Sequence, residues 1–157
     1  MAPRSRKNAP TRRLKGFTLF ELLIVVVILG ICATMAGPAM SRIVRHQRVN
    51  RASMIIVSDM QNAFAVAARQ RMPVRVQADA ATRSYQFTDR QTGAVLRIRA
   101  FYGDTSEYRL TSLVFTPTTF DVFPSGIASV PVTIDLANGD YTRRITASTA
   151  GFVRLKP

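Results

Sequence analysis

The sequence predicts an α+β fold in which a long N-terminal helix packs on a small antiparallel β-sandwich. Three observations lead to this prediction. A nearly unbroken apolar run covers residues 17–40, and apolar residues then recur at three- and four-residue spacing up to a proline at position 73. Beyond that point, short segments alternate strictly between apolar and polar residues, and turn residues separate them. We therefore expect one helix, followed by about six to eight strands.

The chain begins with a basic segment that contains no acidic residue. The whole chain has 22 basic and 9 acidic residues, and its formal net charge is +13. The apolar run that follows has about 24 residues, whereas the core of a secretory signal peptide has about 7–15. It has the length of a transmembrane helix, and the preceding basic cluster predicts a cytoplasmic N-terminus. Four arginines after the run oppose this orientation, but they are fewer.

One acidic residue, Glu21, interrupts the apolar run. An acidic side chain costs about 2.5–3.5 kcal/mol at the centre of a bilayer and less near its surface, so it indicates a functional site. No cationic side chain is close to it in the apolar run. If the chain were cut after Gly16, the new amine of Phe17 would lie on the same helical face as Glu21. That amine, or the amine of a neighbouring subunit, would neutralise the carboxylate. The alternative is an ordinary anchor helix with a stray glutamate.

The residues around this glutamate read Lys15-Gly16-Phe17-Thr18-Leu19-Phe20-Glu21, and the apolar helix continues through Gly30. This segment resembles the class III signal of type IV prepilins and type II secretion pseudopilins. The resemblance implies that prepilin peptidase cuts after Gly16 and methylates the amine of Phe17. It also implies that Glu21 pairs with the N-terminus of an adjacent subunit during assembly. Gly30 and Pro38 match a glycine and a proline that are frequent in this family, and Pro38 is expected to bend the helix.

These features divide the chain into four segments. We expect a cleaved leader over residues 1–16, a transmembrane and assembly half of the helix over 17–40, an amphipathic half over 41–72, and a periplasmic antiparallel β domain over 73–157. An apolar stripe should pack the amphipathic half on the β domain. The stripe comprises Val49, Ala52, Ile56, Met60, Ala63 and Ala67.

A second face of the helix carries Arg42, Arg45, Arg48 and Arg51. These arginines fit a contact with lipid phosphates beside the membrane. They also fit a contact with acidic groups on neighbouring subunits.

The strand predictions rest on alternation and turn signals. Residues 96–100 and 132–136 alternate strictly, and residues 107–116 and 143–147 are expected to form further strands. A turn is expected over residues 89–93, and Asn138-Gly139 is a hairpin signal because both residue types tolerate a positive φ. A Phe-Pro-Ser-Gly turn at 123–126, this hairpin, and the terminal residues 151–155 resemble the H-type minor pseudopilin domain (GspH/FimT-like).

The sequence argues against an enzyme. Its only histidine, His46, follows the apolar run closely, and its only cysteine, Cys32, lies within the run, so neither a metal site nor Cys/His catalysis is expected. No cofactor is expected. The resemblance instead implies a minor pseudopilin, a structural subunit of the type II secretion pseudopilus in the export of folded proteins. The alternative is a FimT-like type IV minor pilin that initiates pili or takes up DNA.

The partners implied by the resemblance are other pilins or pseudopilins, prepilin peptidase and inner-membrane lipid. DNA is a further candidate because Arg143, Arg144, Arg154 and Lys156 would present a basic surface to phosphates. DNA-binding relatives have a C-terminal Gly-Arg-x-Arg pattern, and here phenylalanine stands where the first arginine is expected. Solvated strand faces explain these four cations equally well.

Overall fold

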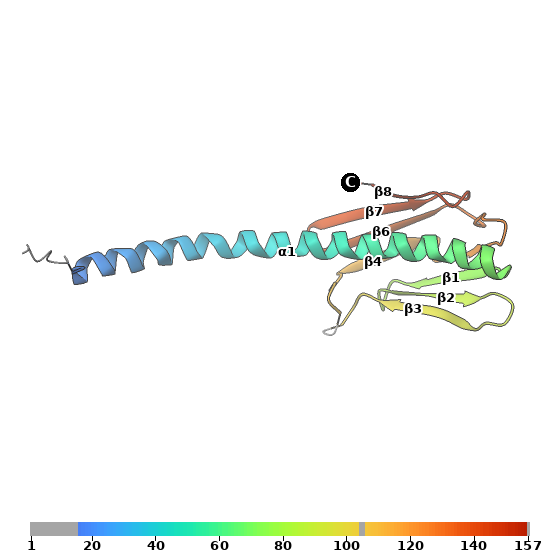
Figure 1. Cartoon of the computed structure of the whole chain (residues 1–157), viewed down its shortest axis with the longest axis horizontal. Helices are drawn as coiled ribbons and strands as arrows, with labels where there is room; N and C mark the ends of the chain where they lie inside the picture. Colours follow the sequence, from blue (N-terminus) through green and yellow to red (C-terminus); the bar gives the residue numbers. More distant parts are fainter. Residues whose placement is uncertain (1–15, 104–105, 157) are drawn as a thin grey trace, which may run out of the picture. The chain divides into compact units, whose positions relative to one another are not determined.

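The computed structural model describes residues 16–103 and 106–156, and for residues 35–39 it describes the backbone alone. The expected leader therefore lies outside the described residues, except for Gly16. These described residues form one long helix followed by eight strands (Figure 1). It divides into two compact units, Met1–Ala39 and Met40–Pro157. The second unit contains both the second half of the helix and all the strands.

Helix α1 covers Leu19–Gln70. The helix ends close to the predicted stop at Pro73. It ends there because Arg71 adopts a left-handed conformation, with φ of 53°, and Pro73 follows two residues later. The helical assignment continues through residues 35–39, so a bend at Gly30 or Pro38 stays a prediction. Within the described residues, no helical stretch combines the length and the hydropathy that crossing a membrane requires.

The eight strands form two four-stranded sheets, and every paired neighbour is antiparallel. The first sheet has the order β3-β2-β1-β5 and the second has the order β4-β6-β7-β8. This arrangement confirms the predicted α+β class with its antiparallel strands. The strands are β1 Val74–Asp79, β2 Ser84–Asp89, β3 Val95–Ala100, β4 Ser112–Thr116, β5 Thr119–Val122, β6 Val132–Asn138, β7 Tyr141–Ala147 and β8 Val153–Lys156.

The core lies where the apolar stripe of α1 meets the inner faces of the sheets. All six residues of the predicted stripe are buried, which confirms that prediction. Val76 and Phe87 face the core from the first sheet, and Ile134 and Ile145 face it from the second. Every member of the core cluster belongs to the second unit. That unit therefore contains the apolar contacts needed to fold by itself.

Two local predictions need correction. The strand expected over 107–116 is β4 alone, because residues 107–111 form bends and an extended connection. The β6–β7 hairpin exists, but Asn138 pairs with Tyr141, so the turn residues are Gly139 and Asp140. Gly139 has φ of 64°. Asn138 stays in the strand, where its side-chain amide donates to the backbone carbonyls of Tyr108 and Arg109 at 3.3 and 3.1 Å.

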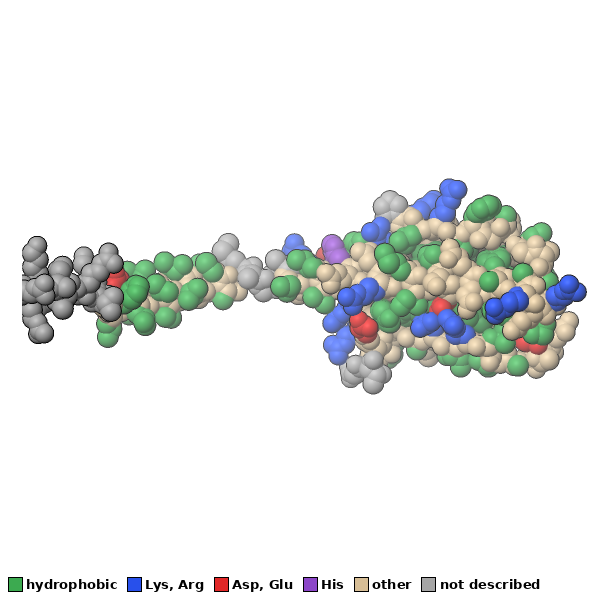
Figure 2. Space-filling model, viewed as in Figure 1, with side chains coloured by type: hydrophobic (Ala, Val, Ile, Leu, Met, Phe, Trp, Pro, Cys, Tyr) green, Lys and Arg blue, Asp and Glu red, His purple; other side chains and the backbone are tan. Residues whose placement is uncertain are grey.

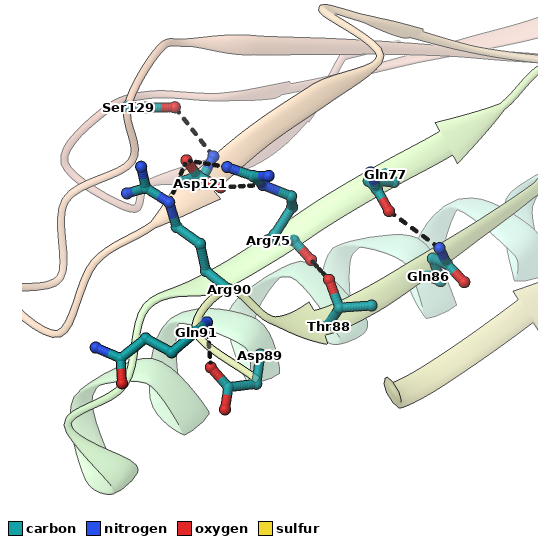
Figure 3. Close-up of polar contacts among 9 residues, drawn as sticks. All are labelled: Arg75, Gln77, Gln86, Thr88, Asp89, Arg90, Gln91, Asp121 and Ser129. Atoms are coloured by element: carbon teal, nitrogen blue, oxygen red, sulfur yellow. Dashed lines mark hydrogen bonds and ion pairs between the residues drawn. The ribbon is translucent and has the colours of Figure 1, made fainter. Parts of the chain in front are cut away.

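The outer face of the first sheet is polar and internally paired (Figure 3). Arg75 on β1 binds both carboxylate oxygens of Asp121 on β5, at 2.8 and 3.3 Å, and Arg90 approaches the same carboxylate to 3.4 Å. On the neighbouring strands, the Gln86 amide donates to the side-chain oxygen of Gln77 at 3.0 Å. These contacts join distant segments of the sheet.

Candidate functional site

The N-terminal part of α1 exposes a continuous apolar surface in the isolated chain (Figure 2). Phe17 is 87% exposed, and Gly16 precedes it just before the helix, with open space around its α-carbon. A contiguous apolar surface of this kind indicates contact with lipid or with other apolar surfaces. The exposed large side chains are Phe17, Leu19, Phe20, Leu22, Leu23, Ile24, Val25, Val26, Val27, Ile28, Leu29 and Ile31.

Glu21 and Thr18 form a reciprocal cap at the start of this helix. The backbone N–H and the hydroxyl of Thr18 donate to Oε2 of Glu21, at 2.9 and 3.1 Å. The N–H of Glu21 donates to the Thr18 hydroxyl at 3.2 Å. This is the capping-box arrangement, and it places the carboxylate at the positive end of the helix dipole. Our sequence reasoning missed the role of Thr18, which the Thr-x-x-Glu spacing would have revealed.

The structure brings Gly16, Phe17 and Glu21 to one helix end, as their spacing requires. Because of the cap, the carboxylate of Glu21 already has donors before any neighbouring subunit arrives. Thr18 binds only one of the two carboxylate oxygens of Glu21, because its N–H and its hydroxyl both donate to Oε2. Among residues 16–103 and 106–156, no donor binds the other oxygen, Oε1.

A second polar cluster joins α1 to the first sheet. Asp59 on α1 has a side chain only 4% exposed, and it accepts hydrogen bonds from three side chains. The Tyr85 hydroxyl donates at 2.6 Å, Arg97 at 2.5 Å, and Arg99 at 2.7 and 3.1 Å. Burial alone would raise the pKa of Asp59, but the hydrogen bonds from Arg99, Tyr85 and Arg97 outweigh it and lower the pKa. Burial and the nearby carboxylate raise the pKa of Tyr85 well above its ordinary value.

The four predicted anion-contacting residues lie on β7 and β8 but not on one face. Arg144 is bound by Asp135 on β6 through two contacts, at 2.6 and 3.1 Å. Arg143, its neighbour on β7, points to the side of α1, where its Nε donates to Asn50 at 3.1 Å. Arg154 and Lys156 alternate along β8 and are both exposed. The structure therefore places Arg144 with Arg154 and Lys156, and separates Arg143 from them by strand alternation.

The described residues offer no cluster of three or more His, Cys, Asp or Glu side chains that would hold a metal ion. His46 stacks on the ring of Tyr141 with centroids 3.9 Å apart, and Cys32 is a free, exposed thiol.

Residues 11–37 match the prokaryotic N-terminal methylation motif. This match confirms the resemblance of the segment to a prepilin signal. Together, the motif and the long helix on an antiparallel β-sandwich define a type IV pilin-like protein. The motif implies that this pilin-like protein is anchored to a membrane.

Two solved proteins share this fold. The type IV minor pilin FimU of Pseudomonas aeruginosa (strain PAO1) is 19% identical, with a TM-score of 0.58 over 71% of this chain and 90% of FimU. The minor pseudopilin EpsH from the type 2 secretion system of Vibrio cholerae is 19% identical, with a TM-score of 0.52 over 69% of this chain and 96% of EpsH. Among proteins of curated function, none matches this sequence significantly.

Proposed function

We propose that this protein is a minor subunit of a type IV pilus-like filament. It is made as a precursor with a cytoplasmic N-terminus, one apolar segment in the inner membrane and a periplasmic β domain. Prepilin peptidase removes the leader after Gly16 and methylates the amine of Phe17. The exposed apolar part of α1 then leaves the lipid and packs against the helices of neighbouring subunits in the filament core.

The main support for this proposal is the position of Glu21. It is a single carboxylate in an apolar helix, and that helix begins with the N-terminal methylation motif. Glu21 lies four residues after the expected new chain end, and in the described part of the chain its cap uses Oε2 alone. In a filament core of low effective dielectric constant, a positive amine attracts this carboxylate more strongly than in water. A subunit inserted in the wrong register leaves a buried charge unpaired, which is costly. The pair would therefore set the register of assembly.

Cleavage of the leader gives the first test. We expect Gly16→Asp to block processing, because a charged side chain replaces the hydrogen atom at the bond that the peptidase must reach. Nothing lies within 4 Å of a side chain added at this position, so the change should not disturb the protein's own packing. Immunoblots of the native host should show only the longer precursor. Ala80→Asp, in an exposed turn and without a positive φ, serves as the control and should be cleaved normally.

Within this class, we propose that the filament is the pseudopilus of a type II secretion system, which exports folded proteins. Resemblance of the C-terminal half to the H-type minor pseudopilin domain supports this choice, as does the similarity in fold to EpsH. The alternative is a type IV minor pilin that initiates pili or takes up DNA, and the similarity in fold to FimU supports it. Exposed Arg154 and Lys156 would then supply phosphate contacts.

Deletion of the gene separates these two machines. If the protein is a secretion subunit, folded exoproteins should accumulate in the periplasm of the deletion strain. Its surface pili and natural transformation should stay at wild-type levels. Loss of pili or of DNA uptake, with normal secretion, would assign the protein to the pilus machine instead. Re-expression of the wild-type chain should restore the affected process, and the uncleavable Gly16→Asp variant should not.

A further inference from the structure

The outer face of the second sheet is polar. Successive residues of a strand point to opposite sides of the sheet, so every second residue of β6, β7 and β8 points away from α1 and the core. The outward residues are Thr133, Asp135 and Ala137 on β6, Thr142, Arg144 and Thr146 on β7, and Arg154 and Lys156 on β8. In β6 and β7, which are described throughout, only one of these six residues is apolar.

Two hollows lie end to end on this face, and we call them together the sheet trough. Their volumes are about 500 and 410 Å³. The first is lined by Ser112, Asp135, Ala137, Thr142, Arg144 and Lys156, and the second by Pro131, Thr133, Thr146, Ser148, Phe152 and Arg154. The trough therefore follows β6 from its last residues back to Pro131, over roughly 20 Å at about 3.3 Å per residue. This length admits an extended chain rather than a single small ion.

Threonine hydroxyls line both hollows. Thr133 and Thr146 stand opposite each other on neighbouring strands, and Thr142 lies in the other hollow. Within the described part of the chain, these three hydroxyls have no hydrogen-bond partner. A hydroxyl group both donates and accepts hydrogen bonds. The trough thus presents groups that can bind the hydroxyls of a ligand in either direction.

An ion pair without net charge stands between these hydroxyls. Arg144 binds both carboxylate oxygens of Asp135, at 2.6 and 3.1 Å, and the two side chains are 58% and 45% exposed. The mutual contacts hold both groups in place. Further lone pairs of the carboxylate and further N–H groups of the guanidinium stay accessible to a ligand. The pair therefore offers acceptors and donors together, which suits neighbouring hydroxyl groups.

An exposed aromatic ring lies at one end of the trough. Phe152 is 69% exposed, and its backbone N–H donates to the Ser148 hydroxyl at 3.2 Å. The N–H of Ser148 in turn donates to the backbone carbonyl of Phe152 at 3.0 Å, so the position of this residue is fixed. A pyranose ring carries hydroxyls around its edge and C–H groups on its faces. Such a ring can pack a face on Phe152 while its edge reaches the hydroxyls.

The chemistry of the trough argues against other chain molecules. A protein interface has an apolar core, whereas the trough floor is polar and its exposed ring lies at one end. A polyanion needs several cations along its path. Here Asp135 stands in the middle of the trough, and its negative charge would oppose an acidic polypeptide and a nucleic acid alike.

We propose that the sheet trough binds an uncharged polysaccharide in extended form. Its hydroxyls would bond to the threonines and to the Asp135–Arg144 pair, and one sugar ring would pack on Phe152. This inference goes beyond the proposed function and does not depend on it. It assigns a carbohydrate-binding surface to the β domain, on the side of the second sheet that faces away from α1.

Binding of an uncharged oligosaccharide tests the trough directly. The probe is a soluble N-acetylglucosamine oligosaccharide, titrated calorimetrically into the full chain in an uncharged detergent that has no sugar headgroup. We expect Thr133→Val/Thr146→Val to weaken binding by about tenfold or more, because two hydroxyls are lost while the side-chain shape is kept. Valine favours strands, so this variant should fold. The matched variant Thr118→Val/Thr119→Val removes two exposed hydroxyls near β5 and should weaken binding less than about twofold.

The aromatic ring gives a second, independent variant. Phe152→Ala removes an exposed side chain and should weaken binding by about threefold or more, whereas Ile98→Ala, which is 64% exposed on β3, should have no effect. Absence of binding to the wild-type chain would overturn the inference, and so would equal losses in a trough variant and its control. It would also be overturned if poly-glutamate or duplex DNA bound more tightly than the oligosaccharide and lost that binding in Thr133→Val/Thr146→Val.

Discussion

The Glu21→Val variant is expected to enter the membrane and to lose its leader normally, yet to be nearly absent from purified filaments. Valine suits an apolar helix, so insertion should not suffer. In the filament, however, the amine of a neighbouring subunit would lose its anionic partner. A charge-assisted hydrogen bond contributes about 1.5–3 kcal/mol. Its loss should therefore lower incorporation by roughly tenfold or more, as measured by immunoblots of sheared or affinity-purified filaments.

Glu21→Gln separates the two roles of this residue. A glutamine at the third helical position can still accept the Thr18 N–H, so the reciprocal cap should persist while the negative charge is lost. If the charge sets the register of assembly, Glu21→Gln should be excluded from filaments almost as strongly as Glu21→Val. Normal incorporation of Glu21→Gln would show that the cap alone matters and would refute the proposed pairing. Glu107→Val, which removes an exposed acid from the second unit, should assemble normally.

The Asp59→Ala variant is expected to lose about 3–5 kcal/mol of unfolding free energy. The substitution removes the shared acceptor of Tyr85, Arg97 and Arg99, and it leaves two guanidinium groups at a site that α1 partly covers. Urea unfolding of residues 40–157, followed by circular dichroism, measures the change. Asp135→Ala breaks an ion pair whose side chains are 45% and 58% exposed, and it should cost about 1 kcal/mol or less. If Asp59→Ala and Asp135→Ala lost similar amounts of unfolding free energy, burial of Asp59 would not be what makes its contacts important.

The same carboxylate predicts how stability depends on pH. The folded-state pKa of Asp59 lies below its ordinary value, so the unfolded chain binds the proton more readily than the folded one. Hydrogen bonds from Arg75 lower the pKa of Asp121 in the same direction. Stability is therefore fully present above about pH 5 and falls as the pH drops through the folded-state pKa values. This acid-dependent loss should be smaller in Asp59→Ala, because one of the responsible groups is gone.

Much of the helix could be predicted from sequence, because its determinants are local. The stripe from Val49 to Ala67 follows helical spacing, and Pro73 marks a stop that Arg71 completes. The processing motif is also local, so its residues could be read directly. The strict alternation of residues 96–100 likewise predicted β3.

Most of the sheet and the side-chain clusters depend on contacts between segments that are distant in the sequence. Strands β1 and β2 are an exception: both alternate apolar and polar residues, so the pattern would have revealed them, but they were not predicted. The Asp59 cluster joins residues 26 to 40 positions apart, which no spacing rule reveals. Arg143 and Arg144 are adjacent in sequence, but strand alternation sends them to opposite sides. The two arginines therefore do not share the surface that the sequence analysis expected. Arg143 binds Asn50 on α1, whereas Arg144 binds Asp135 on β6.

Strand β3 lies at an open edge of its sheet, with Val95 and Ile98 exposed. Such an edge can pair with a strand of another chain. Arg97 and Arg99 turn inward from this edge and hold it to Asp59. An added strand would have to pair with a backbone whose partly exposed side chains, Arg97 and Arg99, are tied to the buried Asp59. The salt cluster that fastens the helix to the sheet thus also restrains the edge strand with which another chain would have to pair.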